Sequence, residues 1–362
     1  MDRKRVCIVT PTFFGHGTGA ANHYGLFARW LLDRGHDVLV ISEAVAPSWQ
    51  RERLSYWGAL PVRTSRNRQS MTAYVAYLRE TMALPRILKA IPDLNPDVVF
   101  LHSAICSRPS VTQRVIAKLR RRTSATIVLD VRDTLSRAAI RRASPHSDIV
   151  TACGLAVSNQ LSQEDVPSDQ VVAFGVAQEP VAVDEASIIE TRERFGLHHP
   201  YVVYSGMLKP SKRVDLLCEA FAVVQAMRPG IELDLVLVGH IKSASRTFNR
   251  KLRAKRIRVI PAQNRDTVLR LVGGAALHIN PSTNESFGRS SLEAIALGVP
   301  CLLPPGVPEF AVLGSRYVCG SSADVIATQI LDLHDSPKPV PYDVTVHAPE
   351  TVYEHLGRRL DL

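Results

Sequence analysis

The sequence lacks any apolar run close to the roughly 18 residues that a membrane-spanning helix needs. Its 362 residues open with basic side chains, but the apolar segment that follows is short and stops at Pro11. A first β-strand fits this segment better than a secretion signal. These absences predict a cytoplasmic protein, and the length is sufficient for two domains.

Paired cysteines are also absent. The six cysteines are scattered, no Cys-x-x-Cys occurs, and the histidines are not clustered. Several cysteines lie inside apolar runs, where a free thiol behaves as a small apolar side chain. The pattern indicates neither a disulfide framework nor a structural zinc site.

Acidic residues are scarce in two stretches of a chain whose net charge is +10. Residues 242–258 contain eight basic residues and no acidic one, and residues 104–144 contain ten against two. Solvated helix faces would explain both stretches. The alternative is attraction of nucleotide phosphates or of an acidic membrane surface that carries a lipid-phosphate acceptor. Aromatic residues make up 6% and do not interleave with these charges, which argues against nucleic acid.

Short β-branched runs alternate with helical periodicity along the whole chain, which is typical of parallel α/β layers. We expect an N-terminal domain over residues 1–178, joined later by a C-terminal helix over 346–362, and a second domain over 179–345. Each would be doubly wound, and the polar stretch 178–200 would connect them. The predicted strands are 6–10, 38–42, 98–101, 126–129, 149–151, 171–174, 201–205, 234–238, 258–260, 276–279 and 301–303. The predicted helices are 20–33, 71–90, 111–121, 215–227, 266–272 and 349–360.

The most specific pattern is Pro-Ser-Thr-Asn-Glu-Ser-Phe-Gly-Arg-Ser-Ser-Leu-Glu-Ala-Ile-Ala-Leu-Gly-Val-Pro at residues 281–300. It places Glu285 in a polar loop after a strand and Glu293 more than one turn into the following helix, which begins near Gly288. A helix N-terminus attracts anions, whereas carboxylates accept hydrogen bonds from sugar hydroxyls. A surface loop before an amphipathic helix would also fit two glutamates, but the surrounding residues favour a sugar-nucleotide site.

This segment resembles the Glu-x7-Glu signature of retaining GT-B glycosyltransferases of the family-4 (glycosyl transferases group 1) type. The resemblance implies a GT-B fold, in which two doubly wound Rossmann-like domains face each other across a cleft. It implies that Glu285 contacts the sugar, that Glu293 binds the nucleotide ribose, and that Ser286, Phe287 and Gly288 complete the donor site. The donor is a co-substrate, so no cofactor and no metal are expected, and no Asp-x-Asp metal motif occurs in a suitable loop.

A second candidate phosphate loop lies at residues 204–215, where a strand leads into a helix. In the family, a Gly-Arg-Leu pattern is followed by Lys-Gly, and here Gly206, Leu208 and Lys212 fit it. Lys212 would neutralise the departing diphosphate. Met207 stands where the family has an arginine, so either Lys209 or Arg213 would supply the second positive charge.

The first strand runs into a loop whose glycines include Gly15, Gly17 and Gly19. Small residues there let backbone N–H groups approach a phosphate or a sugar. Together with Glu43 after the next strand, this loop could imitate a dinucleotide site. Its spacing is not Gly-x-Gly-x-x-Gly, however, so it fits the donor loop of the resembling family better.

Two segments of the first half resemble family motifs that face the sugar. His102 ends an apolar strand and matches the second histidine of an Asp-Val-Val-His-Ala-His segment, although a histidine at a strand end is often structural. Asp133 matches the aspartate of a Val-His-Asp motif, and Arg132 replaces its histidine. We expect His102, Lys212 and Glu285 to be catalytic, and Arg132 and Asp133 to lie on the acceptor side.

The combined expectation is a retaining, metal-independent glycosyltransferase that uses a UDP-, GDP- or dTDP-sugar. The acceptor would be a hydroxyl of a glycan, a lipid-linked sugar or a natural product, with peripheral contact to an acidic membrane as a further option. The alternative is an auxiliary GT-B protein that binds nucleotide sugar without transfer, which Met207 and Arg132 suggest. A dehydrogenase and a GT-B epimerase are weaker alternatives.

Overall fold

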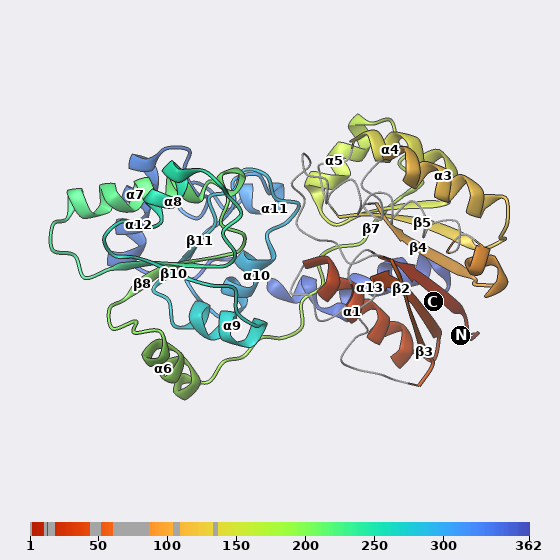
Figure 1. Cartoon of the computed structure of the whole chain (residues 1–362), viewed down its shortest axis with the longest axis horizontal. Helices are drawn as coiled ribbons and strands as arrows, with labels where there is room; N and C mark the ends of the chain where they lie inside the picture. Colours follow the sequence, from red (N-terminus) through yellow and green to blue (C-terminus); the bar gives the residue numbers. More distant parts are fainter. Residues whose placement is uncertain are drawn as a thin grey trace. The chain divides into compact units, whose positions relative to one another are not determined.

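The computed structural model describes residues 2–10, 13, 19–43, 52–60, 87, 89–103, 109–132 and 137–362. The chain divides into two compact units, each treated separately below (Figure 1). Unit 1 contains Met1–Ala177 and His347–Leu362, and unit 2 contains Gln178–Val346.

Unit 1 is built on a seven-stranded sheet in the order β3-β2-β1-β4-β5-β6-β7, and all strand pairs of the described residues are parallel. Its strands are near-continuous apolar runs, as expected for a parallel sheet that is covered on both faces. They are β1 (Arg5–Val9), β2 (Asp37–Glu43), β3 (Leu54–Leu60), β4 (Val98–His102), β5 (Thr126–Val131), β6 (Ile149–Ala152) and β7 (Val171–Ala173).

Helices cover both faces of this sheet. α3, α4 and α5 pack on one face, and α1 packs beside α13 on the other (Figure 1). The second face holds most of the buried aromatic rings, including Phe27, Phe100, Phe174 and Tyr353. The helices are α1 (Gly19–Asp33), α3 (Pro109–Arg120), α4 (Arg137–Ala143), α5 (Leu155–Gln163) and α13 (Pro349–Leu360).

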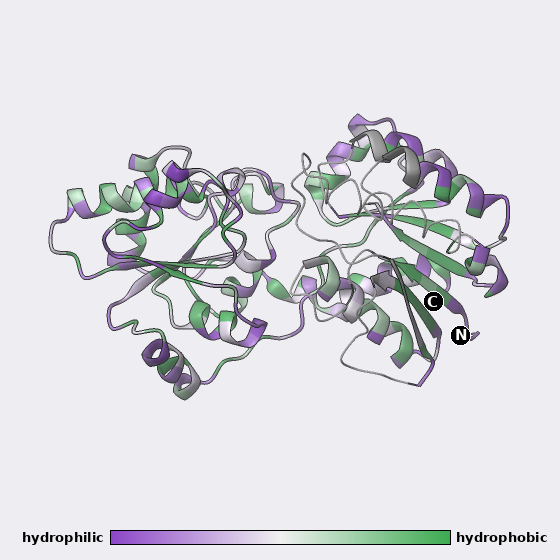
Figure 2. Cartoon of the chain, in the orientation of Figure 1, coloured by the Kyte–Doolittle hydropathy of each residue, from purple (hydrophilic) through white to green (hydrophobic). Residues whose placement is uncertain are grey.

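Unit 2 has a five-stranded sheet in the order β10-β9-β8-β11-β12, again with parallel pairs. α7, α8 and α12 bury one face of it, and α9 and α10 contact strands from the other side. Figure 2 shows apolar strands inside and polar residues on outward helix faces. The strands are β8 (Tyr201–Ser205), β9 (Asp234–Val238), β10 (Ile257–Ile260), β11 (Leu277–Ile279) and β12 (Cys301–Leu302). The helices are α6 (Glu185–Arg194), α7 (Val214–Met227), α8 (Arg246–Lys251), α9 (Arg265–Gly273), α10 (Arg289–Ala296), α11 (Pro308–Ala311) and α12 (Ala323–Asp335).

The strand orders explain where a ligand should bind. In each sheet the order reverses beside the first strand, between β1 and β4 in unit 1 and between β8 and β11 in unit 2. Open α/β sheets bind ligands outside the carboxyl ends of the strands at such a reversal. The loops after β8 and β11 carry the two patterns singled out in the second half of the sequence.

The predicted fold class of two doubly wound α/β units is confirmed. The predicted strands correspond to observed ones within a few residues, but β3 was not predicted. The stretch expected to be an unpatterned connection contains α6, which Asp184 caps by accepting a hydrogen bond from the Ser187 N–H at 2.8 Å. The sequence did not reveal α6 because its apolar pattern is weak, and Ile189, one of its few apolar residues, stays 50% exposed. Most of the predicted helix at 71–90 lies outside the described residues.

Candidate active site

The loop between β11 and α10 presents the Glu-x7-Glu pair. Side-chain turns shape it, because Asn280 Oδ1 accepts from the Ser282 N–H at 3.2 Å and Ser282 Oγ accepts from the Asn284 N–H at 3.4 Å. Phe287 is buried and anchors the loop by packing edge-on against Phe310, with 5.3 Å between ring centroids. The loop that carries Glu285 is therefore fixed, and the neighbouring Ser286 is half-buried.

Gly288 begins α10 with a φ of +89°, a conformation that favours glycine. A Cβ at this position would lie 3.1 Å from the Pro304 ring, so the close approach also favours glycine. No side chain of the described residues caps α10. The Gly288 carbonyl accepts from the Ser291 N–H at 3.0 Å, and the partial positive charge of this helix N-terminus favours an anion nearby.

Lys212 and Glu285 come together at the switch point of unit 2. Lys212 ends a short 3₁₀ turn after β8, and its Nζ lies 2.7 Å from Glu285 Oε1. The same ammonium donates to the Asn284 carbonyl at 3.3 Å. Both side chains are largely buried, at 19% and 16% exposure. Two residues 73 positions apart in sequence thus form one charged pair where a ligand is expected.

The remaining basic residues of this loop are placed differently from one another. Arg213 adopts a φ of +55° at the start of α7 and donates to the Ser321 carbonyl at 2.7 Å, on the α12 side. Lys209 is half-buried before the 3₁₀ turn, and Met207 is 47% exposed. Lys209 has no ion pair within the described residues, so it can contact a ligand more readily than Arg213 can.

Two glycines let the strands β8 and β9 end side by side. Gly206 and Gly239 have φ values of +152° and +150°, and a Cβ on Gly239 would lie 1.8 Å from the Gly206 carbonyl oxygen. The Tyr204 hydroxyl donates to the Met207 carbonyl at 3.2 Å, which fixes the turn after β8. Burial, followed by the negative charge of Glu285, raises the pKa of this hydroxyl, so it remains a donor.

Glu293 has a partner that the sequence patterns did not reveal. Arg265, the first residue of α9, places its Nε 3.1 Å from Glu293 Oε1. The Glu293 side chain is 11% exposed and that of Arg265 is 35% exposed. Only the spatial contact between α9 and α10 shows this pair, because no spacing rule links residues on two helices.

In unit 1 two of the expected residues, Gly19 and His102, lie at ends of elements that border the switch point between β1 and β4. Gly19 is the first residue of α1, and His102 is the last residue of β4. The His102 side chain is buried, and its ring lies edge-on to Tyr24 with 5.8 Å between centroids. Gly17 and Asp133 lie outside the described residues.

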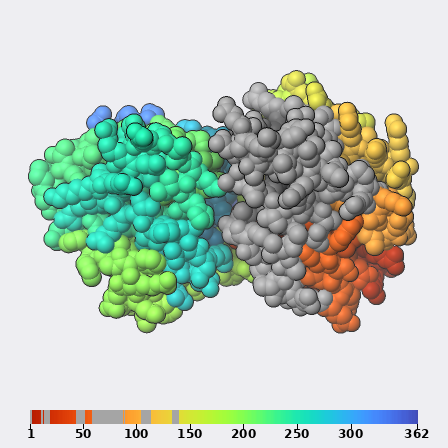
Figure 3. Space-filling model, in the orientation of Figure 1, coloured from red at the N-terminus to blue at the C-terminus, as the bar shows by residue number. Residues whose placement is uncertain are grey.

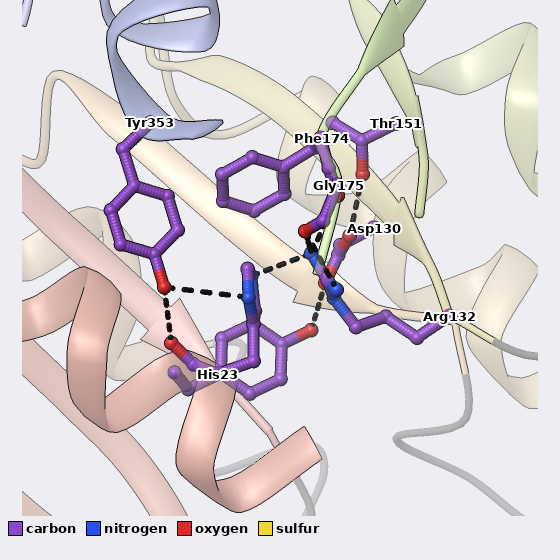
Figure 4. Close-up of polar contacts among 8 residues, drawn as sticks. His23, Asp130, Arg132, Thr151, Phe174, Gly175 and Tyr353 are labelled. Carbon is purple, nitrogen blue, oxygen red and sulfur yellow. Dashed lines mark hydrogen bonds and ion pairs between the residues drawn. The ribbon is translucent and has the colours of Figure 1, made fainter. Parts of the chain in front are cut away.

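Arg132 lies in a buried polar cluster rather than on the surface of unit 1 (Figure 4). Its side chain is 7% exposed, and its Nε donates to Asp130 Oδ2 at 3.0 Å. Its terminal nitrogens donate to the Phe174 carbonyl at 2.9 Å and to the Gly175 carbonyl at 3.3 Å, and one contacts His23 Nε2 at 2.6 Å. Burial disfavours the charged guanidinium, but the Asp130 carboxylate and neighbouring groups hold its pKa above the usual value.

Three other side chains complete this cluster. Asp130 accepts from Thr151 Oγ1 at 2.5 Å and from the Tyr24 hydroxyl, whose pKa burial and then Asp130 raise well above its usual range. Tyr353 on α13 donates to the His23 carbonyl at 3.1 Å. The cluster joins α1, β5, β6, the end of β7 and α13. Arg132 therefore helps to hold unit 1 together, and its role on the acceptor side remains a prediction.

Of the two basic stretches in the sequence, residues 242–258 lie at the surface, as both interpretations of the charge pattern require. This segment of unit 2 is visible in turquoise in Figure 3. Lys251 pairs with Glu219 there, and Arg256 and Arg258 pair with Asp234. Within the described residues, no helix is long and apolar enough to cross a membrane. No group of three His, Cys, Asp or Glu side chains in that same part of the chain could hold a metal ion.

Two family descriptions match the chain, one in each half. Glycosyltransferase Family 4 matches residues 17–174, and Glycosyl transferases group 1 matches residues 188–340. Among curated proteins, the phosphatidyl-myo-inositol mannosyltransferase of Propionibacterium freudenreichii subsp. shermanii is 24% identical over 345 residues, which are 91% of this chain and 87% of that protein. The D-inositol 3-phosphate glycosyltransferase of Jonesia denitrificans is 30% identical over 110 residues, or 28% of this chain and 26% of that one.

Solved structures of other proteins superpose on nearly the whole chain. HepE of Anabaena superposes with a TM-score of 0.74 at 14% identity, covering 99% of this chain and 100% of that chain. An α,α-trehalose-phosphate synthase of Burkholderia xenovorans gives a TM-score of 0.70 at 10% identity and the same coverage. At these identities the likeness concerns the fold.

Proposed function

Because the chain belongs to the GT-B glycosyltransferases of the family-4 type, we propose that it transfers a sugar from a UDP-, GDP- or dTDP-sugar with retention of the anomeric configuration. The acceptor is a hydroxyl of a glycan, a lipid-linked sugar or a natural product. The observation that carries the proposal is the placement of Lys212, Glu285 and Glu293 in unit 2, around the loops that follow β8 and β11. HepE, a protein of the same fold, is described in complex with UDP and glucose, which supports a nucleotide-sugar donor.

The proposed donor site divides between the two glutamates. Glu293 accepts hydrogen bonds from the ribose, and Glu285 accepts them from the sugar. Lys212 and the first turn of α10 after Gly288 face the diphosphate between them. Gly206 directly follows the strand β8 that leads into the Lys212 loop, and the segment 261–262 after β10 contacts the base.

The Lys212–Glu285 pair shows how charge is balanced before a donor binds. A diphosphate brings two or more negative charges and competes with Glu285 for the ammonium. Lys212 then carries positive charge to the leaving group, and Glu285 becomes available to a sugar hydroxyl. Lys209 is the better candidate for the second cation, because Arg213 already donates to Ser321.

In the reaction we propose, the bond between the anomeric carbon and the diphosphate oxygen breaks as the acceptor oxygen bonds to the same face of that carbon. The acceptor proton passes to the departing diphosphate. The protein orients both partners and stabilises the developing charge. Lys212, Lys209 and the helix N-terminus at Gly288 supply this stabilisation, so we propose that no metal takes part.

Unit 1 supplies the acceptor side in this proposal. His102 and the start of α1 at Gly19 flank the switch point between β1 and β4. Arg132 acts there by supporting the strand end, and we propose that Asp133, the next residue in the sequence, contributes to the acceptor side. For a lipid-linked acceptor, the basic residues of α3 and its C-terminal turn, such as Lys118, Arg121 and Arg122, would meet an acidic membrane.

A second candidate is a protein that binds nucleotide sugar without transferring it. Met207, exposed where the family has an arginine, favours it because the site carries one positive charge fewer. Thermal shift with UDP-, GDP- and dTDP-sugars, combined with an assay of donor turnover, separates the candidates. Stabilisation with turnover supports the enzyme, and stabilisation without turnover favours the binding protein. The absence of both effects contradicts both candidates.

A further inference from the structure

Arg265 is the only charged partner of Glu293 within the described part of the chain, and the pair is partly buried. We propose that Arg265 is a positioning residue that gives the donor site its preference for ribonucleotides over deoxyribonucleotides. It does so by holding the Glu293 carboxylate in the orientation that accepts a ribose hydroxyl. This inference rests on the proposed function with a UDP- or GDP-sugar as the donor, since dTDP itself carries a deoxyribose.

The support of Arg265 is rigid. It is the first residue of α9, and Asn264 Oδ1 caps that helix by accepting from the Thr267 N–H at 2.8 Å. The same helix is tied to β8, because the Tyr201 hydroxyl donates to the Leu271 carbonyl at 2.7 Å. A fixed first turn leaves the guanidinium few positions, and in one of these its Nε meets Glu293 Oε1.

The pair is poorly explained as a device for stability. The N-terminus of a helix carries partial positive charge, so a cation at its first residue is unfavourable there. The next residue, Asp266, has the charge that suits this position. A cation retained in this place is better explained by what it does to Glu293.

The geometry leaves one carboxylate oxygen for a ligand. Arg265 donates to Oε1, and Glu293 Oε2 has no hydrogen bond from the described residues and is not a buried unpaired atom. A carboxylate that is fixed in this way does not rotate to find its ligand. Its hydrogen bond to a ribose hydroxyl is charge-assisted, which makes the absence of that hydroxyl costly.

The position of Arg265 also links ribose recognition to base recognition. It closely follows the segment 261–262, which leaves the carboxyl end of β10 and which we propose contacts the base. Gln263 donates to the Pro261 carbonyl at 2.9 Å and so stiffens this segment. The same short stretch of chain, from the end of β10 to the start of α9, would thus place the groups that recognise the base and the ribose.

The test compares nucleotide binding by the full-length wild type, Arg265→Met, Arg265→Lys and Glu293→Gln. Isothermal titration calorimetry is run with UDP and GDP, each beside its 2′-deoxy and 3′-deoxy forms. Arg270→Met, on the same helix but without contact to Glu293 among the described residues, is the matched control. The ratio of affinities for ribo and deoxy forms is the readout, because a general loss of stability changes both affinities together.

We expect the wild type and Arg270→Met to prefer the ribo form of the bound nucleotide by about tenfold, the scale of one charge-assisted hydrogen bond. Arg265→Met should reduce this preference to about twofold or less, Arg265→Lys should restore part of it, and Glu293→Gln should abolish it. In turnover assays, Arg265→Met should raise the donor KM with kcat nearly unchanged.

The inference is overturned if Arg265→Met keeps the wild-type preference while Glu293→Gln loses it, or if the wild type has no preference. In both cases the proposed function stands. A wild type that binds none of the six nucleotides overturns the inference, and the proposed function falls with it unless the protein binds dTDP. If Arg265→Met does not fold, the partial preference expected of Arg265→Lys decides.

Discussion

Lys212 Nζ lies 2.7 Å from Glu285 Oε1, so the cation proposed for the diphosphate and the carboxylate proposed for the sugar are partners before any donor binds. This pair keeps both side chains within one loop assembly although they follow different strands. It also means that loss of either residue leaves a largely buried charge without its counterpart.

Lys212→Ala should lower kcat by about tenfold or more, the scale of one lost charge contact to a developing anion. The exposed Lys338 is a suitable control, and Lys338→Ala should leave kcat unchanged. Steady-state kinetics with the donor found by screening measures both. Unchanged turnover in the Lys212 variant would remove this residue from the mechanism.

Arg132→Met should destabilise the protein by about 3–5 kcal/mol, because it leaves the Asp130 carboxylate buried without its cation. Arg228→Met removes an ion pair with Asp335 in which both side chains are more than 40% exposed, and it should change stability little. Urea denaturation of the full chain compares the two. Equal effects would show that the cluster in Figure 4 does not support unit 1.

Gly239→Ala should destabilise unit 2 by about 1–3 kcal/mol more than Gly230→Ala does. Both glycines have positive φ, but a Cβ on Gly239 would lie 1.8 Å from the Gly206 carbonyl oxygen, whereas a Cβ on Gly230 would meet nothing within 4 Å. The first substitution should also weaken donor binding, since it displaces the turn that leads to Lys212. Thermal denaturation and donor affinity are the measurements.

His278 should make the protein sensitive to mild acid. Burial lowers its pKa from 6.5 to about 4, and neither ring nitrogen has a partner in the described part of the chain. The unfolded chain therefore takes up a proton below pH 6.5 that the folded chain refuses, so stability falls from about pH 6.5 to about pH 4 and levels off below. The full loss from this group is about 3 kcal/mol.

The check on this prediction is urea denaturation at pH 7 and pH 4.5. His278→Leu should remove most of the difference between the two values, whereas His355→Leu, which changes an exposed histidine, should not. A difference that persists in His278→Leu would assign the acid sensitivity to other groups.

The sequence predicted the fold well because the parallel strands are buried on both faces and therefore read as continuous apolar runs. Strands β8 and β9 were predicted with their observed bounds for this reason. β3 is an edge strand of its sheet and α6 is largely exposed, so neither has the strong apolar pattern that marks a buried element.

Motif resemblance supplied the family and the two glutamates, but it could not supply the partners. The contacts of Glu285 with Lys212 and of Glu293 with Arg265 depend on how neighbouring loops and helices pack. The burial of Arg132 could not be predicted from the sequence either, because an arginine at a strand end is usually exposed. Only the structure shows that Asp130 and His23 surround it.

The most direct test of the central claim is release of nucleoside diphosphate from UDP-, GDP- and dTDP-sugars in the presence of EDTA and candidate acceptors. The account predicts turnover of at least one donor by the wild type and a donor KM raised about tenfold in Glu293→Ala. A folded wild-type protein that neither binds nor turns over any of these donors would contradict it.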